Sequence, residues 1–181
     1  MKDNNRSMKK LTGFTLIEML VVIGILGIIA TVLFATINPV AQLQKANDAH
    51  RKSDLESLQR ALELYYQDNG CYPHAVSNEI TINDGANCTN GTAVAWGTSW
   101  QVNGQTYMSK LPKDPISSNN YVYYSTGQSY YLYANLQRGA NDPNACNKGN
   151  ACASLSGGGF PAATACGGTC NYGVTSTNVS P

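Results

Sequence analysis

The chain has few of the residues from which enzyme active sites are built. Among its 181 residues there are only two histidines, His50 and His74, and charged residues make up 13%. Neither histidine belongs to a recognisable nucleophile motif, and no glycine-rich loop of the kind that holds a phosphate is present. We therefore interpret both as ordinary surface residues, His50 on the solvent side of a helix, and expect a protein that is not an enzyme.

The chain also lacks the excess of positive charge that attracts nucleic acid. Its formal net charge is +1, and over residues 69–181 four basic residues balance four acidic ones. One local basic cluster remains, formed by Lys45, Arg51 and Lys52. An exposed, solvated helix face explains this cluster, so no specific nucleic-acid partner is expected.

A long uncharged apolar run is the main feature that the chain does have. Residues 19–37 carry no charge, and about 20 apolar residues at roughly 1.5 Å each are enough for a helix to cross a bilayer. The segment before the run is basic, with four basic residues and one acidic residue up to Gly13. Basic residues beside a first span favour the cytoplasmic side. The sequence thus predicts a single-pass helix with the rest of the chain outside the cell membrane.

A lone carboxylate, Glu18, stands at the start of this run. Placing a carboxylate within a membrane helix costs on the order of 3 kcal/mol, so such a residue is normally paired or functional. One alternative is a side chain that reaches the membrane surface from an ordinary anchor helix.

Residues 13–18, G-F-T-L-I-E, resemble the class III signal of type IV prepilins and pseudopilins. In that family a prepilin peptidase cuts after the glycine, the new terminal phenylalanine is methylated, and the glutamate attracts the amine of a neighbouring subunit during filament assembly. The resemblance implies cleavage between Gly13 and Phe14, N-methylation of Phe14, and a role in assembly for Glu18.

The apolar pattern becomes amphipathic from Val40 onward. Spacings of three and four residues place four apolar side chains on one helical face: Leu55, Leu58, Leu62 and Tyr65. Pro39 predicts a kink or a short unwound stretch before this segment. The pair Asn69-Gly70 predicts the end of the helix.

Two further segments resemble the major pseudopilins of type II secretion and many type IV pilins. They are residues 55–73, LESLQRALELYYQDNGCYP, and residues 110–116, KLPKDPI, followed by the tyrosine-rich residues 121–136. This likeness implies a long helix packed on a small antiparallel sheet, and it ends at about Gly139.

Strand signals lie in the middle of the chain. Residues 79–82, EITI, and 93–96, AVAW, favour short strands within a polar loop, and residues 126–128 predict the turn of a hairpin. Alternation along the hairpin places Tyr121 and Tyr123 on one side of the first strand, and Tyr130 with Leu132 on one side of the second. Some aromatic side chains should therefore cover the helix while others face outward. An aromatic ligand surface is the alternative to structural packing of these tyrosines.

Four of the six cysteines lie in the loop-rich segment after residue 139. Cysteines in an exported segment are most simply disulfides, and a local set is preferred among the 15 pairings that six cysteines allow: Cys71 with Cys88, Cys146 with Cys152, and Cys166 with Cys170. A zinc site formed by the last four is an alternative, although the C-x₂-C spacing is missing.

Calcium is a further alternative, because related pseudopilins bind it in a loop after the sheet. Oxygen donors are available in Asn141, Asp142 and Asn144. Calcium sites usually contain several carboxylates, whereas Asp142 is the only carboxylate after Asp114. We therefore expect no cofactor, with calcium left as the open alternative.

These features predict an α+β protein with five segments. Residues 1–13 form a cleaved leader, 14–38 a transmembrane and filament-core helix, and 39–70 its amphipathic continuation. Residues 71–138 form a globular head with a β-hairpin, and 139–181 a disulfide-stapled, cysteine-rich loop region.

The family resemblance implies a major pilin of a type IV pilus, serving adhesion, motility or DNA uptake. The alternatives are the major pseudopilin of a type II secretion system and a monomeric membrane-anchored binding domain. Expected partners are other copies of the chain in a helical polymer, the prepilin peptidase, the inner-membrane assembly machinery, and lipid before assembly. The subunit would start as a single-pass membrane protein and end in a filament at the cell surface.

Overall fold

A computed structural model describes residues 13–36, 38–77, 79–83, 88, 91–152 and 164–177. The chain divides into two compact units, Met1–Ala41 and Gln42–Pro181. The expected leader, apart from Gly13, lies outside the described residues.

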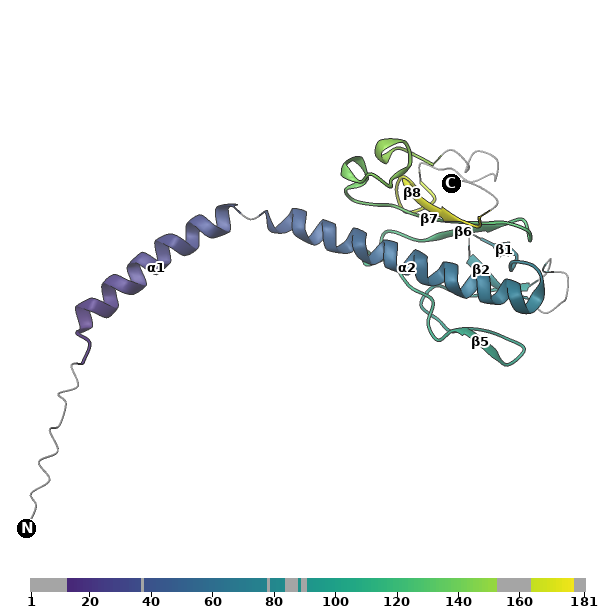
Figure 1. Ribbon diagram of the computed structural model, residues 1–181, viewed down its shortest axis with the longest axis horizontal. Coiled ribbons are helices and arrows are strands. Elements are labelled where there is room, and N and C mark those ends of the chain that lie inside the picture. The colour runs from purple at the N-terminus through teal and green to yellow at the C-terminus, as the bar shows by residue number, and fades with distance from the viewer. Residues whose placement is uncertain are drawn as a thin grey trace, which may run out of the picture. The chain divides into compact units, whose positions relative to one another are not determined.

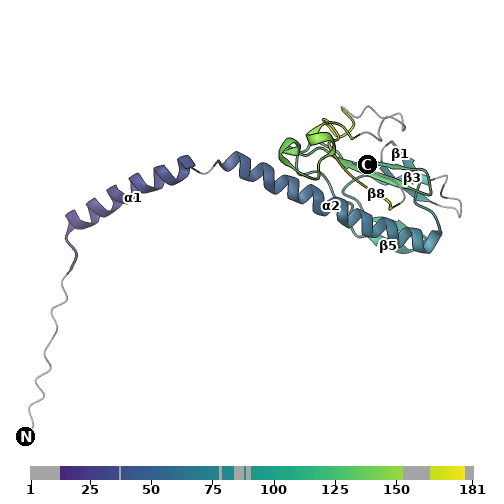
Figure 2. The ribbon, with the colours of Figure 1, turned by 45° about the horizontal axis from the view of Figure 1, so that its top comes forward.

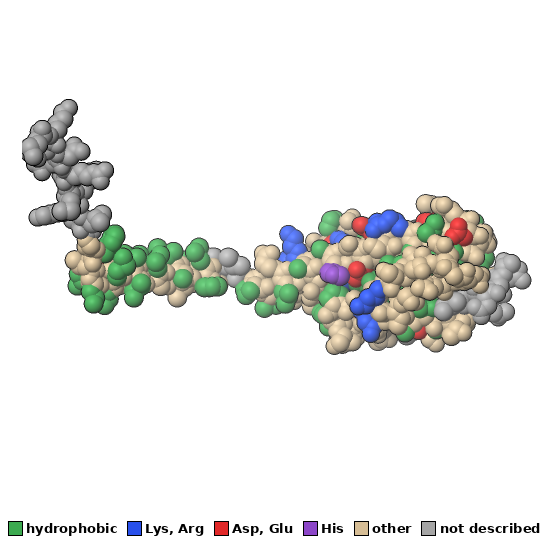
Figure 3. Space-filling view, turned by 90° about the horizontal axis from the view of Figure 1, so that it is seen from below, with side chains coloured by type: hydrophobic (Ala, Val, Ile, Leu, Met, Phe, Trp, Pro, Cys, Tyr) green, Lys and Arg blue, Asp and Glu red, His purple; other side chains and the backbone are tan. Residues whose placement is uncertain are grey.

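The first unit contains helix α1, Leu16–Thr36. Over Leu16–Phe34 it is long and apolar enough to cross a membrane, and none of this stretch is buried within the chain. The space-filling view shows apolar side chains over the visible face of the helix (Figure 3). Because apolar residues surround this helix, it needs an apolar environment that its own chain does not supply.

The predicted interruption near Pro39 is confirmed as a break between two helices. Helix α1 ends at Thr36, and helix α2, Pro39–Asn69, begins at the proline itself. Proline suits the first position of a helix because its missing N–H would have no partner there. The side chain of Asn38 accepts a hydrogen bond from the Ala41 amide at 3.1 Å, which caps the new helix.

The second unit is organised on helix α2. The predicted apolar face is confirmed, because Leu55, Leu58, Leu62 and Tyr65 are all buried. The helix ends at Asn69, and Gly70 follows with φ at +75°, the left-handed conformation that glycine favours.

Among the described residues, eight short strands form three antiparallel sheets beside this helix. The sheets are β1–β2–β3, β4–β5 and β6–β7–β8. Their bounds are Ala75–Val76 for β1, Glu79–Asn83 for β2, Gly91–Ala93 for β3, Trp100–Val102 for β4, Gln105–Met108 for β5, Val122–Ser125 for β6, Tyr130–Ala134 for β7 and Tyr172–Thr175 for β8. Figures 1 and 2 show the strands arranged around α2, with β5 on the other side of the helix from β6, β7 and β8 in Figure 1.

The strand predictions for the middle of the chain are partly correct. The hairpin of β6 and β7 is confirmed, with Ser125 paired to Tyr130, and residues 79–82 lie in β2. The expected strand at 93–96 is wrong beyond Ala93, since β3 covers only Gly91–Ala93. The hairpin of β4 and β5 was not predicted, although its turn residues Asn103 and Gly104 both have positive φ, as a two-residue hairpin turn requires.

Two clusters of apolar side chains hold the head together. The first joins α2 to the inner face of β6 and β7, and it contains Tyr121, Tyr123, Tyr130 and Leu132. The prediction that some aromatic side chains of the hairpin cover the helix is confirmed. The second lies on the opposite face of that sheet, where Val122 and Tyr133 pack against cysteines of the C-terminal region. Tyr133, on the face turned away from the helix, is therefore buried and not exposed, because the cysteine-rich region covers it.

The cysteine-rich region is fastened to the sheet by strand β8 and by Asn171. β8 pairs with β7, extending the sheet. The buried Asn171 side chain accepts a hydrogen bond from the Leu136 amide at 2.7 Å and donates one to the Leu136 carbonyl at 3.0 Å. Two short 3₁₀ helices, η1 at Gly139–Asn141 and η2 at Cys146–Gly149, lie between β7 and β8 in the sequence.

Candidate assembly site

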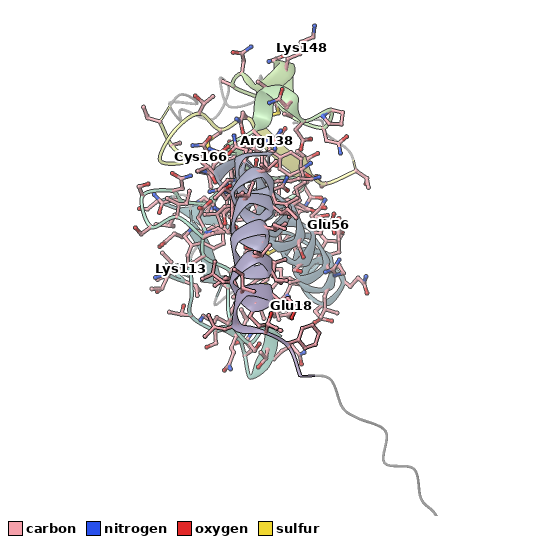
Figure 4. All side chains as sticks on the ribbon, turned by 90° about the vertical axis from the view of Figure 1, so that its left-hand side faces the viewer. Glu18, Glu56, Lys113, Arg138, Lys148 and Cys166 are labelled. Atoms are coloured by element: carbon pink, nitrogen blue, oxygen red, sulfur yellow. A yellow bond between two sulfur atoms is a disulfide. The ribbon has the colours of Figure 1, made fainter. Side chains whose placement is uncertain are left out.

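The N-terminal turn of α1 brings together the residues implicated in processing and assembly. Gly13 and Phe14 precede the helix, and the Phe14 side chain is 79% exposed. Glu18 lies in the first turn of α1 (Figure 4). The scissile bond expected from the sequence is thus next to the exposed apolar helix.

Glu18 is engaged by Thr15 in a reciprocal cap. The Thr15 amide and hydroxyl each donate a hydrogen bond to Glu18 Oε2 at 2.7 Å, and the Glu18 amide donates to Thr15 Oγ1 at 3.3 Å. This is a capping box, whose pattern of Thr followed three residues later by Glu could have been found in the sequence. The carboxylate is therefore hydrogen-bonded within its own chain.

The rest of α1 presents apolar side chains on every side. Exposed fractions of its large side chains range from 48% for Val22 to 83% for Leu16. A surface of this kind, 19 residues long, suits lipid or other helices of the same type. Such a surface has no reactive groups, so it can associate with lipid or with other helices but cannot catalyse a reaction.

The head contains a buried charge cluster that sequence reasoning missed. Arg51, expected to be an exposed basic residue, has no exposed surface. Its Nη1 lies 2.8 Å from Asp48, and its Nε and Nη2 lie 2.7 and 2.8 Å from the two oxygens of Asp114. Burial opposes the charge, but the hydrogen bonds and charges of Asp114 and Asp48 raise the pKa of Arg51 above its ordinary value.

This cluster connects three parts of the chain. Asp114 comes from the Leu-Pro-Lys-Asp-Pro segment, and its Oδ1 also accepts the Ile116 amide at 2.8 Å. The Asp48 oxygens accept the amides of Gln137 and Arg138, each at 2.8 Å. Helix α2 is thereby fixed to the loop before β6 and to the segment after β7.

The basic cluster expected on α2 is consequently not a free positive surface. Arg51 is neutralised by two carboxylates, and Lys52 forms an ion pair with Asp142. Lys45 is exposed. The single histidine on this helix, His50, is exposed and contacts Asp54 at 3.2 Å.

The tyrosines act mainly as packing and hydrogen-bonding residues of the head. Tyr121 donates to Asp54 at 2.6 Å, and Tyr123 donates to the Pro73 carbonyl at 2.8 Å. Tyr72 and Tyr130 both donate to Glu63. The part of the hairpin left for an aromatic ligand surface is thus small.

The structure contains three disulfides, which are the local set preferred from the sequence. They join Cys71 to Cys88, Cys146 to Cys152, and Cys166 to Cys170. Sulfurs joined in this way are not thiolates, so the four C-terminal cysteines do not provide zinc ligands in this form.

Comparison with known families gives two matches that cover different parts of the chain. Residues 8–34 match the prokaryotic N-terminal methylation motif. Residues 38–152 match the family of type II secretion system protein G. The matched residues include α2, the Arg51 ion cluster and the β6–β7 hairpin. No solved structure matches the chain.

Several curated proteins named type II secretion system core protein G are similar to this chain. The protein from Vibrio cholerae is 34% identical over 128 residues, covering 67% of this chain and 76% of the relative. Those from Escherichia coli and Pseudomonas aeruginosa are 32% and 30% identical, covering 68% and 74% of this chain and 78% and 91% of the relatives.

Proposed function

Because this chain belongs to the family of type II secretion system protein G, we propose that it is the major pseudopilin of a type II secretion system. It is a structural subunit that acts by polymerising. The observation that carries this proposal is the family match over residues 38–152, which covers most of the head. The type IV pilus, placed first on the sequence alone, becomes the second candidate.

Processing is the first step of the proposed assembly. The peptidase cuts between Gly13 and Phe14 and methylates Phe14, leaving α1 attached to the head. The match to the N-terminal methylation motif over residues 8–34 supports this step. Before assembly α1 anchors the subunit in the inner membrane, as its uniform apolar surface allows.

Association of α1 helices then drives polymerisation. Contacts among apolar helices in a filament replace their contacts with lipid, so close packing and paired polar groups decide the outcome. Glu18 is proposed to exchange its Thr15 hydrogen bonds for the Phe14 amine of a neighbouring subunit. The exchange keeps the carboxylate paired in the apolar core, where an unpaired charge would be costly.

The remaining partners follow from this role. They are other copies of this chain, the prepilin peptidase and the inner-membrane assembly machinery. The heads form the outer surface of the resulting fibre, which lies beyond the inner membrane. The secreted cargo would meet this surface or the fibre tip.

The test is deletion of the protein in its own host. We expect proteins that normally appear in the medium to remain inside the cell envelope, and wild-type chain to restore their release. A Gly13→Val variant should stay unprocessed and fail to restore it, whereas a Thr106→Ser variant, changed at an exposed position of β5, should restore it. Normal release after deletion, with loss of long surface fibres, would favour the pilus candidate instead. Normal location and activity of the unprocessed variant would favour a monomeric anchor.

A further inference from the structure

A lysine of helix α2, Lys52, pairs with the loop after β7 at the place where the sequence left calcium as an alternative. Asp142 Oδ2 is paired with the ammonium of Lys52, and its Oδ1 accepts the Asn144 amide at 2.9 Å. Burial opposes ionisation of Asp142, but the hydrogen bonds of Lys52 and Asn144 lower its pKa below the ordinary value. Both oxygens of this carboxylate are therefore already used by donors of the chain.

The other carboxylate beside this loop is also occupied. Asp48 and Asp142 both line a cavity of about 420 Å³. Asp48 accepts hydrogen bonds from Arg51 and from the amides of residues 137 and 138. Calcium requires six to eight oxygen ligands, usually including several carboxylates. Both carboxylates here already accept hydrogen bonds from donors of the chain.

The charge of the cavity also opposes a divalent cation. Its lining includes three cationic side chains, Lys45, Lys52 and Arg138, against the two carboxylates. Within the part of the chain that the structure describes, no group of three or more His, Cys, Asp or Glu side chains could hold a metal ion. The residues present do not fit calcium.

Lys52 is held in place by more than Asp142. Its ammonium lies 5.3 Å from the centre of the Tyr172 ring, within the range of a cation–π contact. The lysine comes from α2, Asp142 from the loop after η1, and Tyr172 from β8. One ammonium group thus links the helix, the loop and the third strand of the sheet.

We propose that the Lys52 ammonium fills the structural role that a bound calcium ion has in related pseudopilins, so that this head folds without metal. The ammonium neutralises Asp142 and fixes the loop against the helix and β8. The Cys146–Cys152 disulfide and the hydrogen bond from the Cys146 amide to the Asn171 carbonyl, at 2.8 Å, hold the next part of the loop. This inference concerns folding of the subunit and does not depend on which fibre it forms.

The test is thermal unfolding of the processed, oxidised full-length chain in detergent micelles, followed by near-ultraviolet circular dichroism. We expect the same Tm with excess EDTA as with excess CaCl₂. A calcium site filled at about one hundred times its Kd would instead raise the Tm by roughly 5–10 °C. Such a rise, or a saturable calcium titration by calorimetry, would overturn the proposal.

Two variants test the lysine itself. Lys52→Met keeps much of the aliphatic stem but removes the ammonium, and we expect it to lower the Tm by roughly 2–4 °C in both EDTA and CaCl₂. Lys45→Met is the matched control, because it removes a charge from the lining of the same cavity while the Lys52–Asp142 pair is kept, and its Tm should match that of the wild type. A Lys52→Met chain as stable as the wild type would contradict the proposal.

A third variant tests whether the ammonium occupies a cation position, even if Lys52→Met fails to fold. Lys52→Glu places a second carboxylate beside Asp142, which creates a pair suited to a hard cation. We expect this variant to be less stable than the wild type in EDTA and to regain Tm on addition of CaCl₂. A calcium response equal to that of the wild type would contradict the idea that the ammonium occupies a cation position.

Discussion

The two helices of this chain use apolar residues in opposite ways. In α1, side chains such as Leu26 and Phe34 are 58% and 81% exposed, whereas Leu55 and Leu58 in α2 have no exposed surface. The head satisfies its apolar surface internally, with strands and disulfides of its own chain. Helix α1 depends on lipid or on other subunits, so the two regions should respond differently to the same kind of substitution.

The charged groups of the two regions differ in the same way. Glu18 in α1 is capped by Thr15, three residues away. Arg51 in the head is bound by Asp48 of the same helix and by Asp114, which is 63 residues away in the sequence. Local pairing leaves Glu18 able to change partner, whereas the pairing of Arg51 fixes the fold.

The largest effect is expected from Arg51→Met. Loss of the guanidinium leaves the buried carboxylate of Asp114 without its bidentate partner, and breaking a buried pair costs about 3–5 kcal/mol. Urea unfolding followed by tryptophan fluorescence measures the change. Arg60→Met is the control, since Arg60 is exposed and its guanidinium donates a hydrogen bond to Ser57 of the same helix. Equal stability of the two variants would show that the cluster does not hold the head.

The next effect comes from a matched pair of leucines. Leu58→Ala opens a cavity in the core and should lower the free energy of unfolding by about 2–5 kcal/mol. Leu26→Ala should leave unfolding of the head unchanged, because Leu26 touches no core, and should instead reduce the amount of cross-linked polymer recovered from cells. A stability loss from Leu26→Ala would mean that α1 also packs within its own subunit.

A smaller effect is expected at the capping box. Thr15→Ala removes the hydroxyl that both donates to Glu18 and accepts its amide, and should destabilise the first turn of α1 by about 1 kcal/mol. Amide hydrogen exchange of the processed chain in micelles detects this as faster exchange at residues 16–19. Thr31→Ala is the control, since Thr31 bonds the Ile28 carbonyl inside the same helix, and it should leave exchange at those residues unchanged.

The smallest effect is a loss of stability at alkaline pH, which is not seen at neutral pH. Burial, with the nearby carboxylates Asp54 and Glu63, raises the pKa of Tyr121 and Tyr72, and burial raises that of Tyr123, from the ordinary value of 10.0. The folded head therefore holds these protons more tightly than the unfolded chain, so stability is complete below pH 10 and falls as the pH rises above it. Tyrosinate absorbance should show these groups ionising together with unfolding, and their ionisation in a folded head would contradict the expectation.

Local patterns predicted the parts of the fold that local forces determine. The spacing of Leu55, Leu58, Leu62 and Tyr65 identified the buried face of α2, and Asn69-Gly70 identified its end, because both depend on neighbouring residues. The break at Pro39 and the turn at residues 126–128 are of the same kind. The G-F-T-L-I-E pattern likewise predicted the candidate processing site without any tertiary information.

The features that the sequence did not reveal depend on distant residues. Arg51 looked like part of a basic cluster because Asp114, its main partner, lies far along the chain. The cover over Val122 and Tyr133 was missed because its apolar contacts come from cysteines in a loop-rich segment. The β4–β5 hairpin and the Thr15–Glu18 cap are different, because both have local signals in the sequence, Asn103-Gly104 and Thr-x-x-Glu.

Each disulfide of this chain closes a loop within one short stretch, with sequence separations of 17, 6 and 4. None of them joins the cysteine-rich region to helix α2 or to the β6–β7 hairpin. That region is attached instead by non-covalent contacts, which include the β8 ladder, the Asn171 amide, the Lys52–Asp142 ion pair and the packing of Val122 and Tyr133 against cysteines. Its loops can therefore change in length or sequence without breaking a disulfide to the helix or to the hairpin.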